Sequence, residues 1–169
     1  QRNARAYAEA LRAAPGEVMV LLETTAGTGT SLGSRFEELA ELRSLIPPDL
    51  RHRIGYCADT CHLYSAGYDL VNAYDAVWEE WERLIGIEHL HCLHLNDSKV
   101  GFASNRDRHE NLGDGEIGEE GLRRFLGHPD LQSLPVILEV PGMDGSGPDL
   151  ENMARARRLH EAGVGARAA

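Results

Sequence analysis

Residues 54–59, IGYCAD, form a short apolar run that closes on a carboxylate, and this stretch decides the fold because three other runs repeat it. Each run ends in a side chain of the metal-ligand type: VMVLLE (18–23) at Glu23, IGYCAD (54–59) at Asp59, LHCLH (90–94) at His94 and VILE (136–139) at Glu139. Continuous apolar runs of this length are typical of buried parallel strands. Their end residues can form one site together only where the strand ends converge, as they do at the C-terminal face of a parallel α/β barrel.

Helical patterns separate these runs along the whole chain. The strands are expected at residues 17–23, 53–59, 89–95 and 135–140. The helices are expected at residues 2–14, 36–46, 72–85, 119–127 and 149–162. Ser34 and Glu37 have the spacing of a capping box before the second helix. Strands that alternate with helices indicate a parallel sheet.

The pattern contains four βα units, whereas a closed (β/α)₈ barrel typically has eight units in about 250 residues. Two folds fit: a small open α/β sheet, or half of a barrel. Ligands of an open sheet gather at one switch point, so a ligand-type residue at the end of every strand favours the barrel. We therefore predict an α/β fold of the TIM barrel family, with residues 1–169 forming a single domain, a C-terminal half-barrel without its N-terminal half.

The composition fits one folded domain. The chain has 169 residues, of which 42% are hydrophobic, and this is sufficient for a core. No apolar run approaches the ~18 residues that span a bilayer, so we expect no membrane partner. Three cysteines, an odd number, do not form a disulfide framework. We expect Cys57 and Cys92 to be small buried residues in a protein of the reducing cytoplasm.

The net charge of −10 disfavours nucleic acid as a partner when it is taken alone, because phosphate binding normally shows as a basic patch. This argument weakens if several of the acids are metal ligands. Each bound Zn²⁺ would add two positive charges at the site itself. Lys99 and Arg108 are the cations expected near that site, where they could hold phosphate oxygens.

The first candidate site consists of the four strand-end residues. Three carboxylates that converge on one point repel one another strongly unless a positive charge lies between them. Oxygen and nitrogen ligands in this mixture suit Zn²⁺, Mn²⁺ or Fe²⁺. The sequence therefore predicts a divalent metal site formed by Glu23, Asp59, His94 and Glu139.

A second candidate site lies in the polar segments that follow two of the strands. Asp107 and His109 point the same way if the segment between them is extended, because alternate residues then share a side. His62, three residues after Asp59, leaves the end of a neighbouring strand. His62, Asp107 and His109 together would supply three ligands and leave one position open, which is the pattern of a catalytic zinc.

Five motifs in order give the chain a resemblance to a known family. They are LETTAGTGTSLG (22–33), CADTCHLYSAGYDL (57–70), HLNDSK (94–99), DRHENLGDGEIG (107–118) and PVILEVPG (135–142). In these motifs the chain resembles the endonuclease IV-type apurinic/apyrimidinic (AP) endonucleases, from about residue 1 to residue 162. That family is a (β/α)₈ barrel with three zinc ions that cuts double-stranded DNA 5′ to abasic sites, a step of base excision repair.

The resemblance implies roles for the same residues. Glu23 would bridge two zinc ions, and Asp59, His94 and Glu139 would complete the shell of one of them. His62, Asp107 and His109 would hold the third ion. Glu23 and Glu139 would be the carboxylates closest to the chemistry. The remaining zinc of the family takes two histidines from strands that this chain lacks, so about two of the three sites are expected here.

Two rivals remain at this point. Sugar isomerases and epimerases of the xylose isomerase-like barrels also carry Glu, Asp, His and Glu on successive strands around one divalent ion. The pair Asp107 and His109, in a long segment, has a role in the nuclease and none in the epimerase. The second rival is an inactive fragment, since four strands of a barrel leave two open edges that favour self-association. No obligate protein partner is evident from the sequence.

Overall fold

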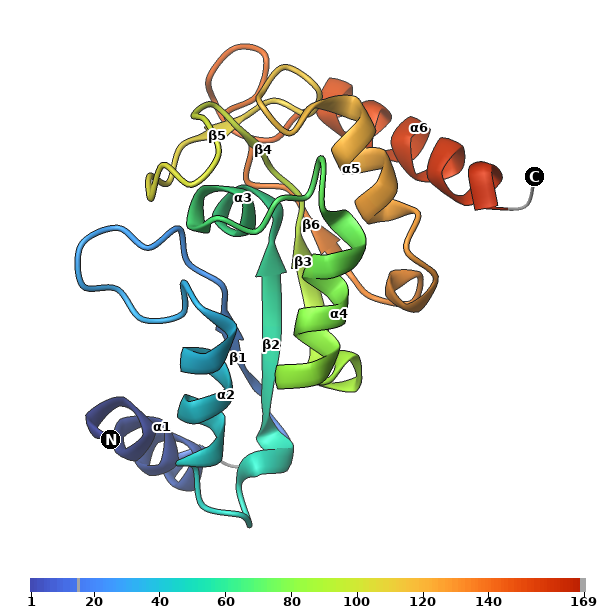
Figure 1. Cartoon of the computed structure of the whole chain (residues 1–169). Coiled ribbons are helices and arrows are strands. Elements are labelled where there is room, and N and C mark those ends of the chain that lie inside the picture. The colour runs from blue at the N-terminus through green and yellow to red at the C-terminus, as the bar shows by residue number, and fades with distance from the viewer. Residues whose placement is uncertain (15, 168–169) are drawn as a thin grey trace.

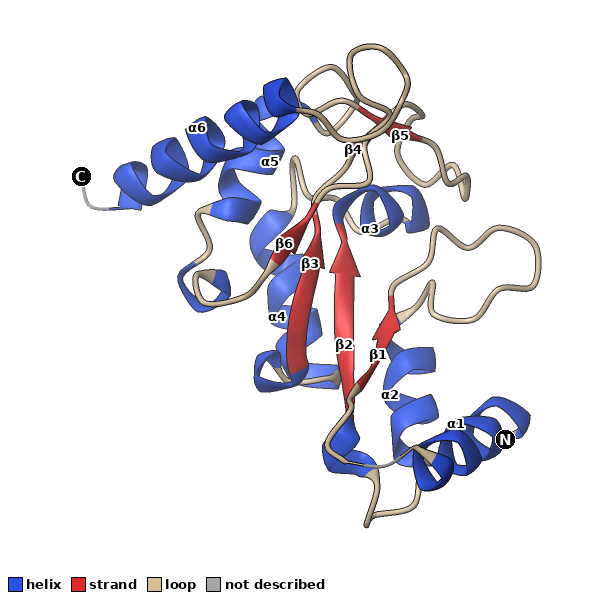
Figure 2. Ribbon diagram, turned by 180° about the vertical axis from the view of Figure 1, so that it is seen from behind, coloured by secondary structure: helices blue, strands red, loops and turns tan. Residues whose placement is uncertain are grey.

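The computed structural model describes residues 1–14 and 16–167, and its centre is a four-stranded parallel sheet (Figures 1 and 2). The strands are β1 (Val20–Glu23), β2 (Ile54–Asp59), β3 (Leu90–His94) and β6 (Val136–Ile137). The helices are α1 (Arg2–Ala13), α2 (Phe36–Ser44), α3 (Thr60–Ala66), α4 (Tyr74–Leu84), α5 (Gly118–Leu126) and α6 (Leu150–Arg167). The predicted α/β architecture with a parallel sheet is confirmed.

The strand order in the sheet follows the chain, β1-β2-β3-β6, and all pairs are parallel. All four carboxyl ends therefore lie at the same edge of the sheet, at the top in Figure 1. The pairing of β2 with β3 shifts by one residue between Tyr56 and Cys57, so that Asp59 lies opposite His94. This register brings two of the predicted ligands side by side.

Two helices cover one face of the sheet. Figure 1 shows α2 and α4 in front of the strands, and Figure 2 shows the strands in front of the same helices. Trp81 of α4 is fully buried and makes edge contacts with Phe36 of α2 and Tyr56 of β2. Phe36 also stacks on Tyr68 at a ring distance of 3.8 Å. These aromatic contacts fix the helix layer against the strands whose ends carry the candidate site.

The segments that follow the strands contain structure that the sequence pattern did not predict. Residues 60–66, which lie outside the helices predicted above, form α3, with Asp59 as its N-cap and Gly67 (φ 103°) as its C-cap. Two short antiparallel strands, β4 (Asp97–Ser98) and β5 (His109–Glu110), form a hairpin within the long polar segment. This segment, residues 97–110, is called the β4–β5 hairpin below.

Other boundaries differ from the predictions. The capping box of α2 does not involve Ser34 and Glu37. Instead, the Glu38 carboxylate accepts hydrogen bonds from the backbone N–H groups of Gly33 (3.0 Å) and Arg35 (3.4 Å). The last helix continues to Arg167 rather than ending at 162, and β6 covers two residues instead of six. Pro15, which directly follows the first predicted helix (2–14), lies outside the described residues.

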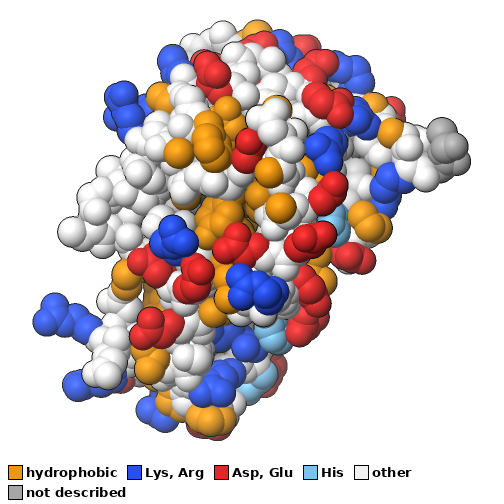
Figure 3. Space-filling model, in the orientation of Figure 1, with side chains coloured by type: hydrophobic (Ala, Val, Ile, Leu, Met, Phe, Trp, Pro, Cys, Tyr) orange, Lys and Arg blue, Asp and Glu red, His pale blue; other side chains and the backbone are white. Residues whose placement is uncertain are grey.

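Among the helices of the described residues, none combines the length and the hydrophobicity that a membrane span requires. The face seen in Figure 3 carries acidic and basic side chains in mixture, and no large basic area covers α2 and α4. A nucleic acid would therefore find little attraction on this helical face.

Candidate metal centre

The four strand-end residues predicted from the sequence gather at one point. Each of Glu23, Asp59, His94 and Glu139 offers a ligand atom, and these atoms all lie within 4.8 Å of one another. We call this group the strand-end cluster. His94 Nδ1 lies at its centre, 3.0 Å from Glu23 Oε1 and 3.2 Å from Glu139 Oε2. The parallel register of the sheet brings these side chains together from four strands or strand ends.

His62, Asp107 and His109 form a second group, which we call the hairpin cluster. The Nε2 atoms of His62 and His109 each lie 3.2 Å from one oxygen of the Asp107 carboxylate. His62 belongs to α3, whereas Asp107 and His109 belong to the β4–β5 hairpin. The seven predicted residues therefore occupy two compact groups, and their role as ligands stays a prediction.

The two clusters adjoin each other. Asp59 Oδ2 is 3.9 Å from His94 Nδ1 and 3.8 Å from His109 Nε2, so this carboxylate lies between them. Glu23 Oε1 is likewise 3.3 Å from His62 Nδ1. A centre built from both clusters can place two cations close together, which is the arrangement that clamps a phosphodiester between metal ions.

The electrostatics of the centre reflect the crowding of carboxylates. Burial lowers the pKa of His62, but the hydrogen bond to Glu23 and the charges of Asp59 and Asp107 outweigh it and raise that pKa to about 9. Burial also acts on the fully buried Asp59, whose pKa it raises. The centre therefore favours positive charge, and a divalent cation supplies it more effectively than a proton on one imidazole.

Backbone carbonyl groups set the orientation of two imidazole rings. His62 Nδ1 is 2.8 Å from the carbonyl oxygen of Thr24, and His109 Nδ1 is 3.1 Å from that of Glu139. A carbonyl oxygen only accepts, so each Nδ1 carries the proton and each Nε2 presents a lone pair when the ring is neutral. This support is typical of histidines that bind metals through the other nitrogen.

The same two Nε2 atoms test whether a cation fits the hairpin cluster. Both are buried and have no hydrogen-bond partner within the described residues, although the Asp107 oxygens are only 3.2 Å away. Buried polar nitrogens without a partner are rare in folded proteins and require an explanation. Two lone pairs and a carboxylate that converge without bonding to one another fit a zinc ion held in common.

Polar residues that the sequence analysis left without a role support the centre. The Asp97 carboxylate, fully buried, accepts hydrogen bonds from five backbone N–H groups, those of Ser98, Gly113, Gly115, Ile117 and Gly118. It thereby folds residues 111–118 against the β4–β5 hairpin. Asn96, also fully buried, contacts Asp59 directly. Both residues lie in the quoted motif HLNDSK, and an Asn-Asp pair directly after a buried strand was the available signal.

Lys99 and Arg108 lie side by side on the β4–β5 hairpin. The backbone N–H of Lys99 donates to the carbonyl of Arg108 at 2.9 Å, and both side chains are exposed. Lys99 Nζ lies 3.9 Å from Glu110 Oε2, a distance too long for a strong ion pair. Arg108 Nη1 donates to the backbone carbonyl of Asp107. Both side chains nevertheless remain exposed, so they could contact a polyanion that approaches the hairpin cluster, and that contact stays a prediction.

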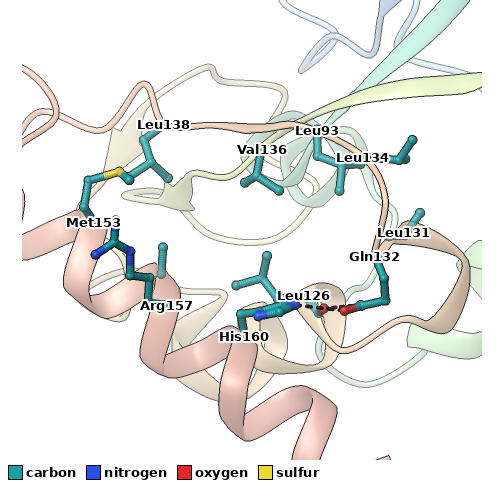
Figure 4. A pocket seen from close by; sticks show the side chains of 11 residues that line it. Leu93, Leu126, Leu131, Gln132, Leu134, Val136, Leu138, Met153, Arg157 and His160 are labelled. Atoms are coloured by element: carbon teal, nitrogen blue, oxygen red, sulfur yellow. Dashed lines mark hydrogen bonds between the residues drawn. The ribbon is translucent and has the colours of Figure 1, made fainter.

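An apolar cavity of about 270 Å³ lies away from both clusters, between β6, α5 and α6 (Figure 4). Its lining includes Leu93, Val136, Leu138 and Met153. Val136 and Ile137 of the edge strand β6 remain 41% and 47% exposed. The ionisable residues that line the cavity, Arg157 and His160, are not among the groups of metal-type ligands, so the strand-end cluster is the stronger candidate site.

Comparison with known proteins places this chain in a family. The profile of the xylose isomerase-like TIM barrels matches residues 1–162. The probable endonuclease 4 of Alkaliphilus oremlandii is 47% identical over 140 residues, which are 82% of this chain and 49% of that protein. The probable endonuclease 4 of Halothermothrix orenii is 42% identical over 156 residues, 89% of this chain and 55% of that protein.

The crystal structure of endonuclease IV from Thermus thermophilus superposes with a TM-score of 0.80 at 36% sequence identity and covers 95% of this chain and 56% of that chain. The protein therefore belongs to the xylose isomerase-like TIM barrels. Within them, it is a member of the endonuclease IV family. The chain spans about half the length of the curated relatives that it matches, which confirms the prediction of a partial barrel.

Proposed function

We propose that this chain forms the C-terminal half of a zinc-dependent AP endonuclease, which hydrolyses the phosphodiester 5′ to an abasic site in double-stranded DNA. One observation carries the proposal: two adjoining clusters of nitrogen and oxygen ligands meet at the carboxyl edge of one parallel sheet. The similarity to proteins called probable endonuclease 4 supports the same reaction. Residues 1–169 act as a single domain in this proposal.

The cations would be held by the residues already described. Glu23, Asp59, His94 and Glu139 would hold one zinc ion, with Glu23 and Glu139 nearest the reacting phosphate. The hairpin cluster would hold another. When bound, such ions activate water near neutral pH and polarise the phosphodiester. Mn²⁺ fits the oxygen-rich strand-end cluster as an alternative ion.

The side chains of this chain contribute binding and orientation. The carbonyl groups of Thr24 and Glu139 fix two imidazole tautomers, so the ligand atoms are arranged before a cation arrives. Lys99 and Arg108 contact phosphate oxygens flanking the abasic nucleotide. An abasic nucleotide leaves the helix stack at low energetic cost because it has no base to unstack, which contributes to selectivity.

The proposal predicts different cleavage activities for the isolated chain and for a complete barrel that contains it. The purified chain is expected to cleave an abasic duplex slowly or not at all in Zn²⁺, since the family's remaining zinc takes two histidines from the other half of the barrel. A chimera that joins the N-terminal half of the Thermus thermophilus enzyme to residues 1–169 should restore cleavage. Glu139→Gln in the chimera should remove that activity while the circular dichroism spectrum stays unchanged.

Two results would overturn the proposal. A folded chimera that leaves abasic DNA intact but epimerises ketoses would assign the site to the sugar-processing barrels. Cleavage by the isolated chain at the rate of the chimera would show that the N-terminal half is dispensable, against the expected inactivity of the isolated chain. The open edges β1 and β6 also predict self-association of the isolated chain, and light scattering that shows a monomer would contradict that part.

A further inference from the structure

Asn96 connects three strand ends through its backbone and its side chain. It follows β3, has no exposed surface, and takes part in four hydrogen bonds. Its backbone N–H donates to Thr60 Oγ1 at 2.8 Å, and its backbone carbonyl accepts from the same hydroxyl at 2.6 Å. Thr60 therefore anchors the Asn96 backbone to the end of β2, which leaves the side-chain amide for other partners.

The neighbours of the amide determine its orientation. Asn96 Oδ1 lies 2.9 Å from the backbone nitrogen of Glu139, which can only donate. The oxygen must therefore face Glu139, and the Nδ2 group must face Asp59, whose Oδ2 accepts at 2.6 Å. The reverse orientation would place a donor against a donor and an acceptor against a carboxylate.

This amide prepares Asp59 for a shared role. Asp59 has no exposed surface, so its carboxylate has lost its water shell and needs donors to remain charged. The backbone N–H of His62 donates to Oδ1 at 2.9 Å, and Asn96 donates to Oδ2. Each oxygen thus has one donor that fixes its position and a further lone pair directed to the clusters.

The same amide reaches the hairpin cluster through Glu139. Asn96 holds the Glu139 backbone through its N–H, and the Glu139 carbonyl in turn contacts His109 Nδ1 at 3.1 Å. The position of one Asn side chain therefore affects Asp59 and Glu139 directly and His109 at one remove. The Asn96 side-chain amide thus contacts both the Asp59 carboxylate and the Glu139 backbone.

We propose that Asn96 is a positioning residue that fixes Asp59 and Glu139 in the geometry in which they hold a divalent cation, and that it couples the strand-end cluster to the hairpin cluster. The proposal rests on the metal-dependent function proposed above. It concerns how the ligands are arranged, since the two ends of the Asn96 amide are engaged by Asp59 and by the Glu139 backbone.

The test measures Zn²⁺ binding to the whole chain by isothermal titration calorimetry, together with the absorption spectrum of the Co²⁺-loaded protein. Asn96→Ala should weaken Zn²⁺ binding by about 10- to 100-fold, the usual range for residues that orient metal ligands. The Co²⁺ bands should also change in position or intensity, because the ligand geometry changes. Asn96→Ser is the second variant, since its short hydroxyl keeps polarity but cannot reach both partners.

Asn152→Ala is the matched control. Asn152 is also fully buried, and it bonds to the Leu112 N–H and to Asn111 and Asp149 rather than to the clusters. Its loss should lower stability to a similar extent and leave the Zn²⁺ affinity and the Co²⁺ spectrum of the wild type. This control separates loss of a buried amide from loss of a positioned ligand.

The outcomes distinguish this inference from the proposed function. A folded wild-type chain that binds no Zn²⁺ would overturn the metal centre itself. Zn²⁺ binding by the wild type that persists within twofold in a folded Asn96 variant, with the same Co²⁺ spectrum, would overturn the positioning role alone. An equal loss of affinity in Asn152→Ala would also overturn it, because the effect would then be a general consequence of destabilisation.

Discussion

The strand-end cluster and the hairpin cluster contain the same types of side chain but rest on different supports. Glu23, Asp59 and His94 end strands whose pairing is continuous with the aromatic core. Asp107 and His109 belong to a hairpin of two short strands joined by ten residues. The first cluster therefore inherits its geometry from the sheet, whereas the second depends on contacts that hold a long segment in place.

Those contacts come from three polar side chains. Asn105 Nδ2 donates to the carbonyl of Ala26, and the Thr28 hydroxyl donates to the carbonyl of Asn105, so the hairpin is tied to the segment after β1. Asp97 holds the segment after β5. The two cation sites should therefore respond differently to substitutions, and the hairpin cluster should be the more easily disturbed.

The largest effect is expected for Asp59→Asn, because Asp59 lies between the two clusters. The variant keeps an oxygen that caps α3, so the fold should persist. It removes a charged ligand, and Zn²⁺ affinity should fall by at least about 100-fold. Without metal, the free energy of unfolding should fall by about 1 to 3 kcal/mol, because the new amide nitrogen faces the Nδ2 donor of Asn96 and leaves it without an acceptor. Calorimetry and urea unfolding measure both quantities; unchanged affinity would exclude Asp59 as a ligand.

His109→Ala should distinguish the clusters from each other. In the chimera described above, this change should remove one zinc ion, counted by atomic absorption after dialysis, and most of the activity. The free energy of unfolding without metal should change by less than about 1 kcal/mol, because His109 belongs to a strand of only two residues outside the main sheet. A zinc count equal to that of the unaltered chimera would remove the hairpin cluster from the proposed centre.

Asp97→Asn tests the support of the hairpin without touching either cluster. The new amide offers one acceptor where the carboxylate accepted from five backbone N–H groups. The free energy of unfolding should fall by about 2 kcal/mol, as for lost hydrogen bonds to a charged group. Hydrogen exchange should accelerate at residues 113–118, and the loss of Zn²⁺ affinity should be greater in the hairpin cluster. Asp49→Asn, the same change at an exposed position before β2, is a control that should alter none of these.

The smallest expected effect concerns pH and separates the scaffold from the metal centre. Burial against Trp78 lowers the pKa of His128, which belongs to neither cluster and lies between α5 and the residues before β6. The unfolded chain takes up a proton near pH 6.5 and the folded chain does so only at a lower pH, so stability should fall as pH drops below 6.5. By pH 5.5 the contribution is at most about 1.4 kcal/mol. His128→Gln, unfolded in urea with EDTA, should lose that part of the pH dependence, and an identical profile would contradict it.

The sequence predicted the elements and the seven clustered residues well, because strands that end in ligand-type side chains carry both signals at once. It did not predict α3, since a seven-residue helix is too short to show a periodic stripe. The N-cap Asp59 and the C-cap Gly67 were the available evidence. The roles of Asn96 and Asp97 could not be read from local pattern, because their main partners lie 16 or more positions away along the chain. Strand β6 is shorter than predicted because only Val136 and Ile137 pair with β3, and the sequence pattern does not show where pairing ends.

One irregularity in the sheet has a further consequence. Tyr56 pairs with Leu90, but Cys57 pairs with Cys92, so β3 accommodates an additional residue, His91, at that point. Had the first offset continued, Asp59 would stand opposite Leu93, and His94 would be displaced from the level of its acidic neighbours. The additional imidazole fits over Gly55, where even a methyl group would collide with it. The alignment of the strand-end cluster thus depends on a glycine four residues before Asp59 in β2. Gly55→Ala is therefore expected to shift Asp59 relative to His94, although residue 55 lies within the sheet and touches neither cluster.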